Sequence, residues 1–523
     1  MISQSVILSR EWIKPEQIWD WLDKGVKIEL GVEVKQRIQE GVDFLKKKLE
    51  EDEAFYGINT GFGSLCNTVI EKEQLKELQK NLLMSHACGV GKELPEEIVK
   101  IMLLNKALGL SKGYSGVRVE LVERLLQFYN EEILPVVYEK GSLGASGDLA
   151  PLAHLSLPLI GMGLVKYKGE KIPAGEIYPT FGWEPLDLHP KEGLALLNGT
   201  QFMSSIGLYV LKQLQKWLVL ADIAAAASLV AFDAKSSPFD AVIHRLRPFD
   251  GPYITAQNIR ELLNHQKEFN DNKPYMQDPY SFRCIPQVHG AVKDVYAHVK
   301  RVVEIEINAV TDNPLIIPEE NKILSGGNFH GEPLALSFDY LAMAISEAAS
   351  ISERRIYKLM SGQRGLSAYL TANPGINSGF MIVQYTAAAL VNQSKQMCMP
   401  NSVDSIDSSN GQEDHVSMGA NSALKLLTLV ENLKQVVALE WMSALQAGDL
   451  RKVAWTGIIG QWHEEYRKNV PLLEKDDYMH PYMSYTLDFL DKKSISAAEN
   501  LLLKTTHSQD ILKPESCPFF RFL

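Results

Sequence analysis

The sequence predicts a mainly α-helical fold, built around a bundle of long helices and carrying a smaller mixed region at its N-terminal end. Residues 334–360 and 422–446 each run for over twenty residues without glycine or proline, with apolar side chains on most helical faces. Strand-like patterns are few and short, as at 164–167 and 315–317. Hydrophobic residues make up 46% of the 523-residue chain, enough to fill a large core.

The first expected helices cover residues 33–52 and 73–87, where charged and apolar positions recur at helical spacing. The loop at 55–66 between them holds three glycines, which indicates unusual backbone conformations. A further helical stretch covers 94–138 and leads into a glycine-dense segment at 140–147. The N-terminal half is therefore expected to consist of helices separated by two glycine-rich loops, at 55–66 and 140–147.

Small residues crowd the expected helices at 224–227 and 387–389, which allows neighbouring backbones to approach closely. The sequence shows no internal repeat, low-complexity tract or long linker. We expect two parts: an N-terminal region at 1–200, and a long-helix bundle with a C-terminal helical region at 201–523.

Charge and cysteine content exclude several classes of function. The net charge is −11, from 53 Lys and Arg against 64 Asp and Glu, and the basic residues are dispersed, so nucleic acid is not an expected partner. The five cysteines include no C-x-x-C pair, which argues against a redox or zinc site and favours a reducing compartment. The nearest zinc motif, at 463–467, has Arg467 where H-E-x-x-H requires histidine, so no metal is expected.

The first residues carry charges where a signal peptide needs an unbroken apolar stretch. The most apolar runs, 149–165 and 217–231, are interrupted by residues such as Pro158 and Asp222. We therefore expect a cytoplasmic protein without a membrane span.

The glycine-rich segment 141–148 does not fit three common glycine motifs. A phosphate loop needs Lys and then Ser or Thr after its last glycine, where this chain has Asp148 and Leu149. A dinucleotide fingerprint needs G-x-G-x-x-G after a strand, and a nucleophile elbow needs G-x-S-x-G; neither spacing is present. A plain loop remains the ordinary alternative.

A chemical interpretation accounts for each residue of Ala145-Ser146-Gly147. The amide nitrogen of Gly147 attacks the carbonyl carbon of Ala145 and closes a five-membered ring, and elimination of water leaves Ser146 as a dehydroalanine. Gly147 has no Cβ to hinder its nitrogen, Ser146 supplies a hydroxyl that can leave, and Ala145 is small enough for the turn. The product is a methylidene-imidazolone, an electrophile.

The neighbouring motifs resemble the aromatic amino-acid ammonia-lyase family over most of the chain, in family order. The matching segments are FYGINTGFGSL (55–65), NLLMSHACGVG (81–91), GSLGASGDLAPLAH (141–154), EGLALLNGT (192–200), QDPYSFRCIPQV (277–288), DNPL (312–315), GGNFHGEPLAL (326–336), NSGFMIVQYTAAAL (377–390) and SNGQEDHVSMG (409–419). The resemblance implies the tetrameric, long-helix architecture of that family and a methylidene-imidazolone formed from residues 145–147, with no external cofactor.

The resemblance also implies the residues that act on the substrate. Tyr56 corresponds to the catalytic base, and Asn198 to the residue that hydrogen-bonds the electrophile's carbonyl. Arg283 corresponds to the clamp on the substrate carboxylate, which a guanidinium can hold through two parallel hydrogen bonds. Tyr280 resembles a second tyrosine of the site and shares a face with Arg283 if the stretch is helical. Without the surrounding motifs, core packing would be the favoured interpretation of Tyr56, and a surface ion pair that of Arg283.

Three further positions follow from the resemblance. Gln277 is expected to contact substrate, with a solvated loop amide as the alternative. Phe329 resembles the ring that packs beside the electrophile, a role close to ordinary core packing. Met381 agrees with the members of the family that act on histidine.

Glu413 and His86 bear on the choice of substrate. In this family a carboxylate at the position of Glu413 accompanies histidine substrates, because it can accept an imidazole N–H, whereas beside a phenyl ring it would be buried and unpaired. His86 matches the members that act on histidine but discriminates poorly, since some tyrosine lyases also carry it. The chain departs from the family pattern at His289, where an apolar residue is commoner, and at 366–375.

The resemblance therefore implies elimination of ammonia from L-histidine to give trans-urocanate, as the first step of histidine degradation, by a homotetramer whose sites draw residues from several subunits. Three alternatives stay open: a tyrosine or phenylalanine lyase or 2,3-aminomutase, which Glu413 disfavours; a catalytically silent scaffold, which the intact Tyr56, Ser146, Asn198 and Arg283 disfavour; and a fumarate-type lyase, which needs a basic, serine-bearing loop that we do not find.

Overall fold

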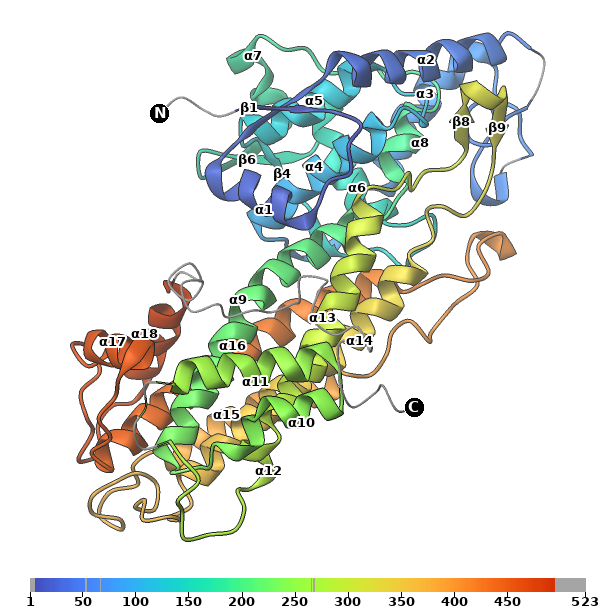
Figure 1. The fold of residues 1–523 in the computed structure, drawn as a ribbon. Coiled ribbons are helices and arrows are strands. Elements are labelled where there is room, and N and C mark those ends of the chain that lie inside the picture. Colours follow the sequence, from blue (N-terminus) through green and yellow to red (C-terminus); the bar gives the residue numbers. More distant parts are fainter. Residues whose placement is uncertain (1–4, 52–53, 66, 265, 267–268, 494–523) are drawn as a thin grey trace, which may run out of the picture. The chain divides into compact units, whose positions relative to one another are not determined.

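The computed structural model describes residues 5–51, 54–65, 67–264, 266 and 269–493 (Figure 1). Helices α14 (Glu332–Leu359) and α16 (Gly419–Leu450) match the two long runs without glycine or proline. Strands β6 (Leu164–Tyr167) and β8 (Leu315–Ile317) match the two short strand patterns. The mainly α fold class with long core helices is confirmed.

The chain forms two compact units, and each is assembled from separate stretches of sequence. The first unit comprises Met1–Tyr209, Lys300–Asp339 and Pro400–Leu424; the second comprises Val210–Val299, Tyr340–Met399 and Lys425–Leu523. Residues distant in sequence therefore meet within each unit.

The first unit contains short helices and several small sheets. Its helices are α1 (Pro15–Lys24), α2 (Val32–Lys48), α3 (Leu75–His86), α4 (Glu96–Ser111), α5 (Val119–Asn130), α6 (Leu149–Ser156), α7 (Tyr178–Phe181) and α8 (Glu192–Leu197). Its strands are β1 (Ser5–Leu8), β2 (Lys27–Leu30), β3 (Val90–Glu93), β4 (Leu134–Pro135), β5 (Tyr138–Lys140), β6, β7 (Glu170–Pro173), β8 and β9 (Lys322–Leu324). β1 pairs with β2 in parallel, while β3 with β5, β4 with β6, β6 with β7, and β8 with β9 are antiparallel.

Helix α4 forms the centre of the first unit. Its own apolar residues are spread around the helix, and nearly every residue from Ile98 to Leu108 is buried, including the polar pair Asn105 and Lys106. A helix that is apolar all round belongs inside a protein rather than at its surface. Helices α3, α6 and α8 contact one another beside it, and their ends carry the candidate site.

The second unit is helical. It contains most of α9 (Gln201–Ala231), α13 (Ile285–Ile307), α14 and α16, together with α10 (Ala241–Leu246), α11 (Asp250–Leu263), α12 (Tyr280–Arg283), α15 (Met381–Gln396), α17 (Gly457–Tyr466) and α18 (His480–Asp491). By length and composition alone, α9 and α14 are apolar enough to cross a membrane. However, 89% and 72% of their most apolar windows are buried inside the protein, as core helices are.

Candidate active site

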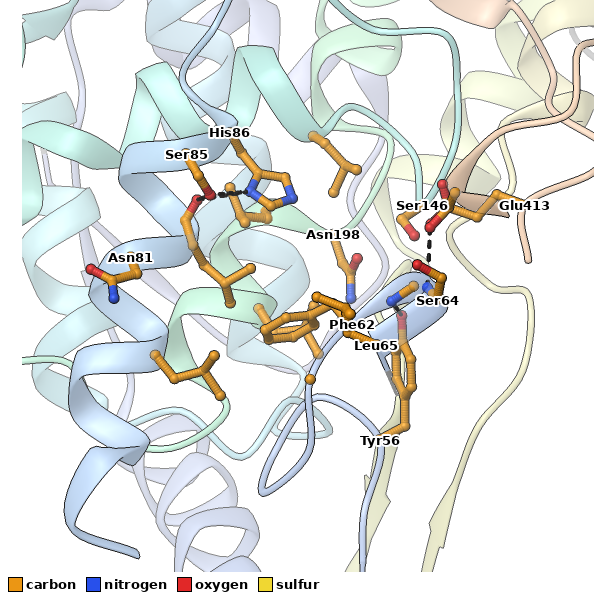
Figure 2. Close-up of a pocket in the computed structure, with 18 of the residues that line it drawn as sticks. Tyr56, Phe62, Ser64, Leu65, Asn81, Ser85, His86, Ser146, Asn198 and Glu413 are labelled. Carbon is orange, nitrogen blue, oxygen red and sulfur yellow. Dashed lines mark hydrogen bonds between the residues drawn. The ribbon is translucent and has the colours of Figure 1, made fainter. Parts of the chain in front are cut away.

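A cavity of about 540 Å³ in the first unit brings together five of the residues that the sequence predicts for the site (Figure 2). They come from distant segments: Tyr56 from the glycine-containing loop at 55–65, His86 from the end of α3, Ser146 from the turn before α6, Asn198 from the end of α8, and Glu413 from the segment 409–413. The cavity is large enough for an amino acid and combines apolar walls with a few polar groups, as ligand sites do.

The turn that contains Ser146 is strained and closely packed. Ser146 has a φ of 52°, in the left-handed region that non-glycine residues rarely adopt. Gly147 follows with a φ of 80°, and a Cβ added to it would lie 2.2 Å from the carbonyl oxygen of Gly199. Only glycine fits at 147, and the strain at Ser146 points to a functional turn.

Two other segments hold this turn in place. The Gly199 N–H donates to the Ser146 carbonyl oxygen at 3.3 Å, and the Asp148 N–H donates to the Gly199 carbonyl at 2.8 Å. On the other side, the Met418 N–H donates to the Leu143 carbonyl at 3.1 Å. The turn is thus braced from both flanks by backbone hydrogen bonds.

Asp148, which the sequence analysis used only to exclude a phosphate loop, is fully buried beneath the turn. Its carboxylate accepts from the Met203 N–H at 3.1 Å and from the Ser142 hydroxyl at 3.3 Å. Burial raises the pKa of Asp148 to about 7. The only sequence signal for this residue was its place in the motif GASGD.

The side chain of Asn198 is oriented by its hydrogen bonds. Its Nδ2 donates to the Asn313 carbonyl at 2.7 Å and to Asp312 Oδ1 at 3.2 Å. Because both partners are acceptors, they fix which end of the amide carries the nitrogen. Both Nδ2 hydrogens are therefore used, and Oδ1 is the atom left to contact a ligand in the cavity.

Tyr56 lies in the glycine loop with its phenol partly buried. The Gly63 N–H donates to the phenol oxygen at 3.1 Å, and the Phe62 ring meets the Tyr56 ring edge-on at 6.3 Å between centroids. The Ser64 N–H donates to Ser409 Oγ at 3.2 Å, which ties this loop to the loop that carries Glu413.

His86 presents an acceptor to the cavity. Its Nδ1 lies 2.9 Å from the Leu82 carbonyl, which can only accept, so Nδ1 carries the proton and the neutral ring leaves Nε2 as an acceptor. Burial lowers the pKa of His86, although the charge of Glu413 opposes this. Glu413 is partly buried, and its Oε2 accepts from the Ser408 hydroxyl at 3.3 Å.

The other predicted site residues do not line this cavity. Phe329 belongs to the first unit and is partly buried. Gln277, Tyr280, Arg283 and Met381 belong to the second unit. Gln277 and Arg283 line a separate cavity of about 390 Å³ there, and Met381 is the first residue of α15.

Helix α12 presents Arg283 and Tyr280 together, as the sequence predicts for a helical stretch. The Arg283 guanidinium stacks over the Tyr280 ring at 4.5 Å, and Tyr280 is 70% exposed. Arg355 donates to the Ser281 carbonyl at 3.4 Å, and the buried Phe282 ring stacks on Phe232. Contacts with the buried residues Arg355 and Phe232 thus hold this helix in place, while the side chains of Tyr280 and Arg283 remain at least partly exposed.

His289, a departure from the family pattern, joins two buried ion pairs in the second unit. Its Nδ1 lies 2.8 Å from Asp222, which Lys293 also contacts at 2.6 Å. Its Nε2 faces Arg355 at 3.2 Å, and Arg355 pairs with Glu440. Burial lowers the pKa of His289, so the ring is neutral and bridges an acceptor and a donor.

A second buried cluster, missed by the sequence analysis, lies behind Asn198. Lys106 donates to the Asn198 main-chain carbonyl at 2.5 Å, and Lys191 pairs with Asp312 at 2.6 Å. Among the described residues, no group of three or more His, Cys, Asp or Glu is placed to hold a metal ion. The charged side chains of this cluster therefore form ion pairs with one another and hydrogen bonds to the backbone.

Comparisons with known proteins point to one family. The model of the aromatic amino acid lyase family matches residues 13–468. A histidine ammonia-lyase of Symbiobacterium thermophilum is 48% identical over 81% of this chain and 84% of its own length. A histidine ammonia-lyase of Deinococcus radiodurans is 45% identical over 91% of each.

Solved structures agree with this assignment. The histidine ammonia-lyase from Trypanosoma cruzi matches with a TM-score of 0.87 at 37% identity, covering 98% of this chain and 99% of that one. A tyrosine aminomutase from Streptomyces globisporus matches with a TM-score of 0.89 at 32% identity, covering 97% and 100%.

Proposed function

This chain belongs to the aromatic amino acid lyase family and is a carbon–nitrogen lyase, and on that premise we propose that it eliminates ammonia from L-histidine to give trans-urocanate. The observation that carries the choice of substrate is the presence of Glu413 and His86 in the cavity that also contains Ser146. A carboxylate accepts an imidazole N–H and stabilises positive charge on the ring, whereas a phenyl ring would leave it unpaired.

Residues Ala145, Ser146 and Gly147 are proposed to form the methylidene-imidazolone. The left-handed Ser146 and the close approach of Gly199 to Gly147 support this, because ring closure needs a compressed turn without a Cβ at 147. Closure and loss of the serine hydroxyl together release two water molecules. The group supplies an electrophile that withdraws electrons from the substrate and so assists departure of the amine.

Tyr56 is proposed to remove the β-proton of the substrate. The Gly63 N–H donates to its phenol oxygen and stabilises the anionic form that a base requires. Glu413 would hold the substrate imidazole, and His86 Nε2 offers a second acceptor for it. Asn198 Oδ1 is available to accept from the substrate amine. Each of these groups orients the substrate or moves a proton.

The carboxylate of the substrate needs a cation, and we infer that Arg283 of a neighbouring copy supplies it, with Tyr280 and Gln277 beside it. Arg283 and Tyr280 are held on an anchored helix with Tyr280 largely exposed, which suits binding between copies. Phe329 and Met381 are proposed to shape the same site.

The same proposal includes a homotetramer. Several large apolar side chains of α14 and α15 are about half exposed, namely Tyr340, Met343, Ile382 and Tyr385. Other copies of the chain would cover them, because large apolar surfaces on an isolated chain usually mark an interface.

The test is to follow the ultraviolet absorbance of a conjugated product after adding L-histidine, L-tyrosine or L-phenylalanine. The proposal expects signal with histidine, none from Ser146→Ala, and an intact mass of the purified chain that is two water molecules below the mass calculated from its sequence. Turnover of tyrosine in place of histidine would leave the electrophile standing and refute the role of Glu413. Absence of turnover with all three would refute the proposed function.

Shared sites are tested separately by mixing. Tyr56→Phe and Arg283→Ala chains are each expected to be nearly inactive, and dissociating and reassembling them together is expected to restore part of the activity. Mixed assemblies without any recovery would show that Tyr56 and Arg283 act from the same copy.

A further inference from the structure

Lys106 is a buried lysine close to the electrophile turn that the mechanism above does not use. It lies on α4 among apolar residues and is 2% exposed. Its ammonium donates to the Asn198 main-chain carbonyl at 2.5 Å and lies 3.4 Å from Gln201 Oε1. Burying an ammonium is costly unless hydrogen bonds or opposite charges compensate it.

The carbonyl that Lys106 contacts belongs to the peptide group joining Asn198 to Gly199. The N–H at the other end of that same peptide group donates to the Ser146 carbonyl oxygen at 3.3 Å. A hydrogen bond to the oxygen of a peptide group draws electrons toward that oxygen and makes its N–H a stronger donor. One planar group therefore connects the ammonium to Ser146.

The Ser146 carbonyl is the one that matters chemically. After ring closure it becomes the ring carbonyl conjugated with the methylidene carbon, so addition of a nucleophile there moves negative charge onto this oxygen. A donor aimed at an oxygen where charge develops lowers the barrier. The Gly199 N–H has that position, whereas both Nδ2 hydrogens of Asn198 are directed to Asp312 and Asn313.

We propose that Lys106 is a positioning residue that acts through the Asn198–Gly199 peptide group, strengthening the Gly199 N–H as a donor to the electrophile's carbonyl. The inference rests on the proposed formation of the electrophile from residues 145–147. In this arrangement the Gly199 N–H is the hydrogen-bond donor to the electrophile's carbonyl, and the charge that strengthens this donor belongs to Lys106.

The groups around Lys106 act on its charge in both directions. Burial lowers the pKa of Lys106 to about 7 and the charge of Lys191 lowers it too, while Asp312 and Asp148 favour the ammonium. Asp312 also contacts Lys191 and the Asn198 side chain. The Asp312 carboxylate thus favours the ammonium form of Lys106 and, through the Asn198 side chain, helps to hold the residue whose peptide group Lys106 contacts.

The test compares Lys106→Met, which removes the charge and the donor, with Lys106→Gln, which keeps a neutral donor on a side chain one atom shorter. The matched control is Lys293→Met, because Lys293 is an equally buried lysine paired with Asp222 in the second unit. Three properties are measured on folded protein: intact mass, the near-ultraviolet band of the conjugated electrophile, and kcat and KM for L-histidine.

Lys106→Met is expected to show the mass of the formed electrophile, a shifted band, and a kcat about ten-fold lower with KM nearly unchanged, since weakening a donor costs less than the loss of about a hundred-fold or more on deleting one. Lys106→Gln is expected to lie between Lys106→Met and the wild type. Lys293→Met is expected to lose stability while keeping the wild-type band.

A folded Lys106→Met chain with the wild-type band and kcat would overturn the inference, as would a band shift of equal size in Lys293→Met. If Lys106→Met does not fold, Lys106→Gln decides by the same criteria. Failure of the proposed function has a different signature, because the wild type would then lack both the mass loss and the band.

Discussion

Replacing Glu413 with glutamine tests the substrate assignment most directly. Glutamine has the same length, and its amide oxygen can keep the hydrogen bond from the Ser408 hydroxyl, which Glu413 Oε2 now accepts at 3.3 Å. The loop backbone should also persist, because Ser408 and Glu413 are joined by main-chain hydrogen bonds of 3.0 and 3.2 Å. The change therefore removes charge with little change in shape.

The size of the effect follows from the kind of hydrogen bond that is lost. A bond to a charged acceptor contributes about 1.5–3 kcal/mol and a neutral one about 1 kcal/mol. If the glutamine presents its amide nitrogen to the imidazole instead, the whole bond is lost. We expect kcat/KM for L-histidine to fall about ten- to one hundred-fold, which corresponds to about 1.4–2.8 kcal/mol of transition-state stabilisation.

The assay compares kcat/KM for L-histidine with that for L-phenylalanine in wild type, Glu413→Gln and Asp414→Asn. Asp414 is the exposed neighbouring carboxylate, so its variant is expected to behave as wild type. The charge of Glu413 raises the pKa of His86, so that pKa, measured by NMR, should fall further in Glu413→Gln. Equal losses with both substrates, or no loss with histidine, would refute the reasoning.

Three further predictions concern the turn, the buried histidine and the base. Gly147→Ala should abolish electrophile formation, seen as a missing mass loss, because its Cβ would lie 2.2 Å from the Gly199 carbonyl oxygen, whereas Gly169→Ala, with a similar φ of 83° and open space, should not. Burial lowers the pKa of His289, so below about pH 6.5 the unfolded chain binds a proton at this residue more readily than the folded chain does. Tm should therefore decrease as the pH is lowered. His289→Leu should flatten this dependence, and an unchanged slope would contradict the assignment. Tyr56→Phe should lower kcat about a hundred-fold or more without changing the mass of the formed electrophile, and full activity would exclude it as the base.

The sequence predicts the long helices because hydrophobic spacing and the absence of glycine and proline are local properties. The runs at 334–360 and 422–446 became α14 and α16 with ends within a few residues of those expected. The discontinuous make-up of the two units is not local, and nothing in the composition of 300–339 or 400–424 shows that these stretches return to the first unit.

The residues of the candidate site also divide into those that the sequence predicts and those that it does not. Motifs and resemblance predict Tyr56, Ser146 and Glu413, because their residue types suit a specific chemistry. They do not reveal Lys106, which looks in the sequence like one charged residue in an apolar helix. Its partner, the carbonyl of Asn198, is a backbone atom, and a hydrogen bond to the backbone leaves no pattern of residue types to detect.

The bracing of the turn at 145–147 has a consequence for when the proposed electrophile would form. The Leu143 carbonyl is held by the Met418 N–H, and the space beside Gly144 is filled by Ser417, whose Oγ would lie 2.3 Å from an added Cβ. A nascent chain has long completed residues 141–148 when the ribosome reaches these partners. On the proposed chemistry, a ring closure that depends on these contacts would wait until residues 417 and 418 have been synthesised, so the reactive group would form inside walls that already exist.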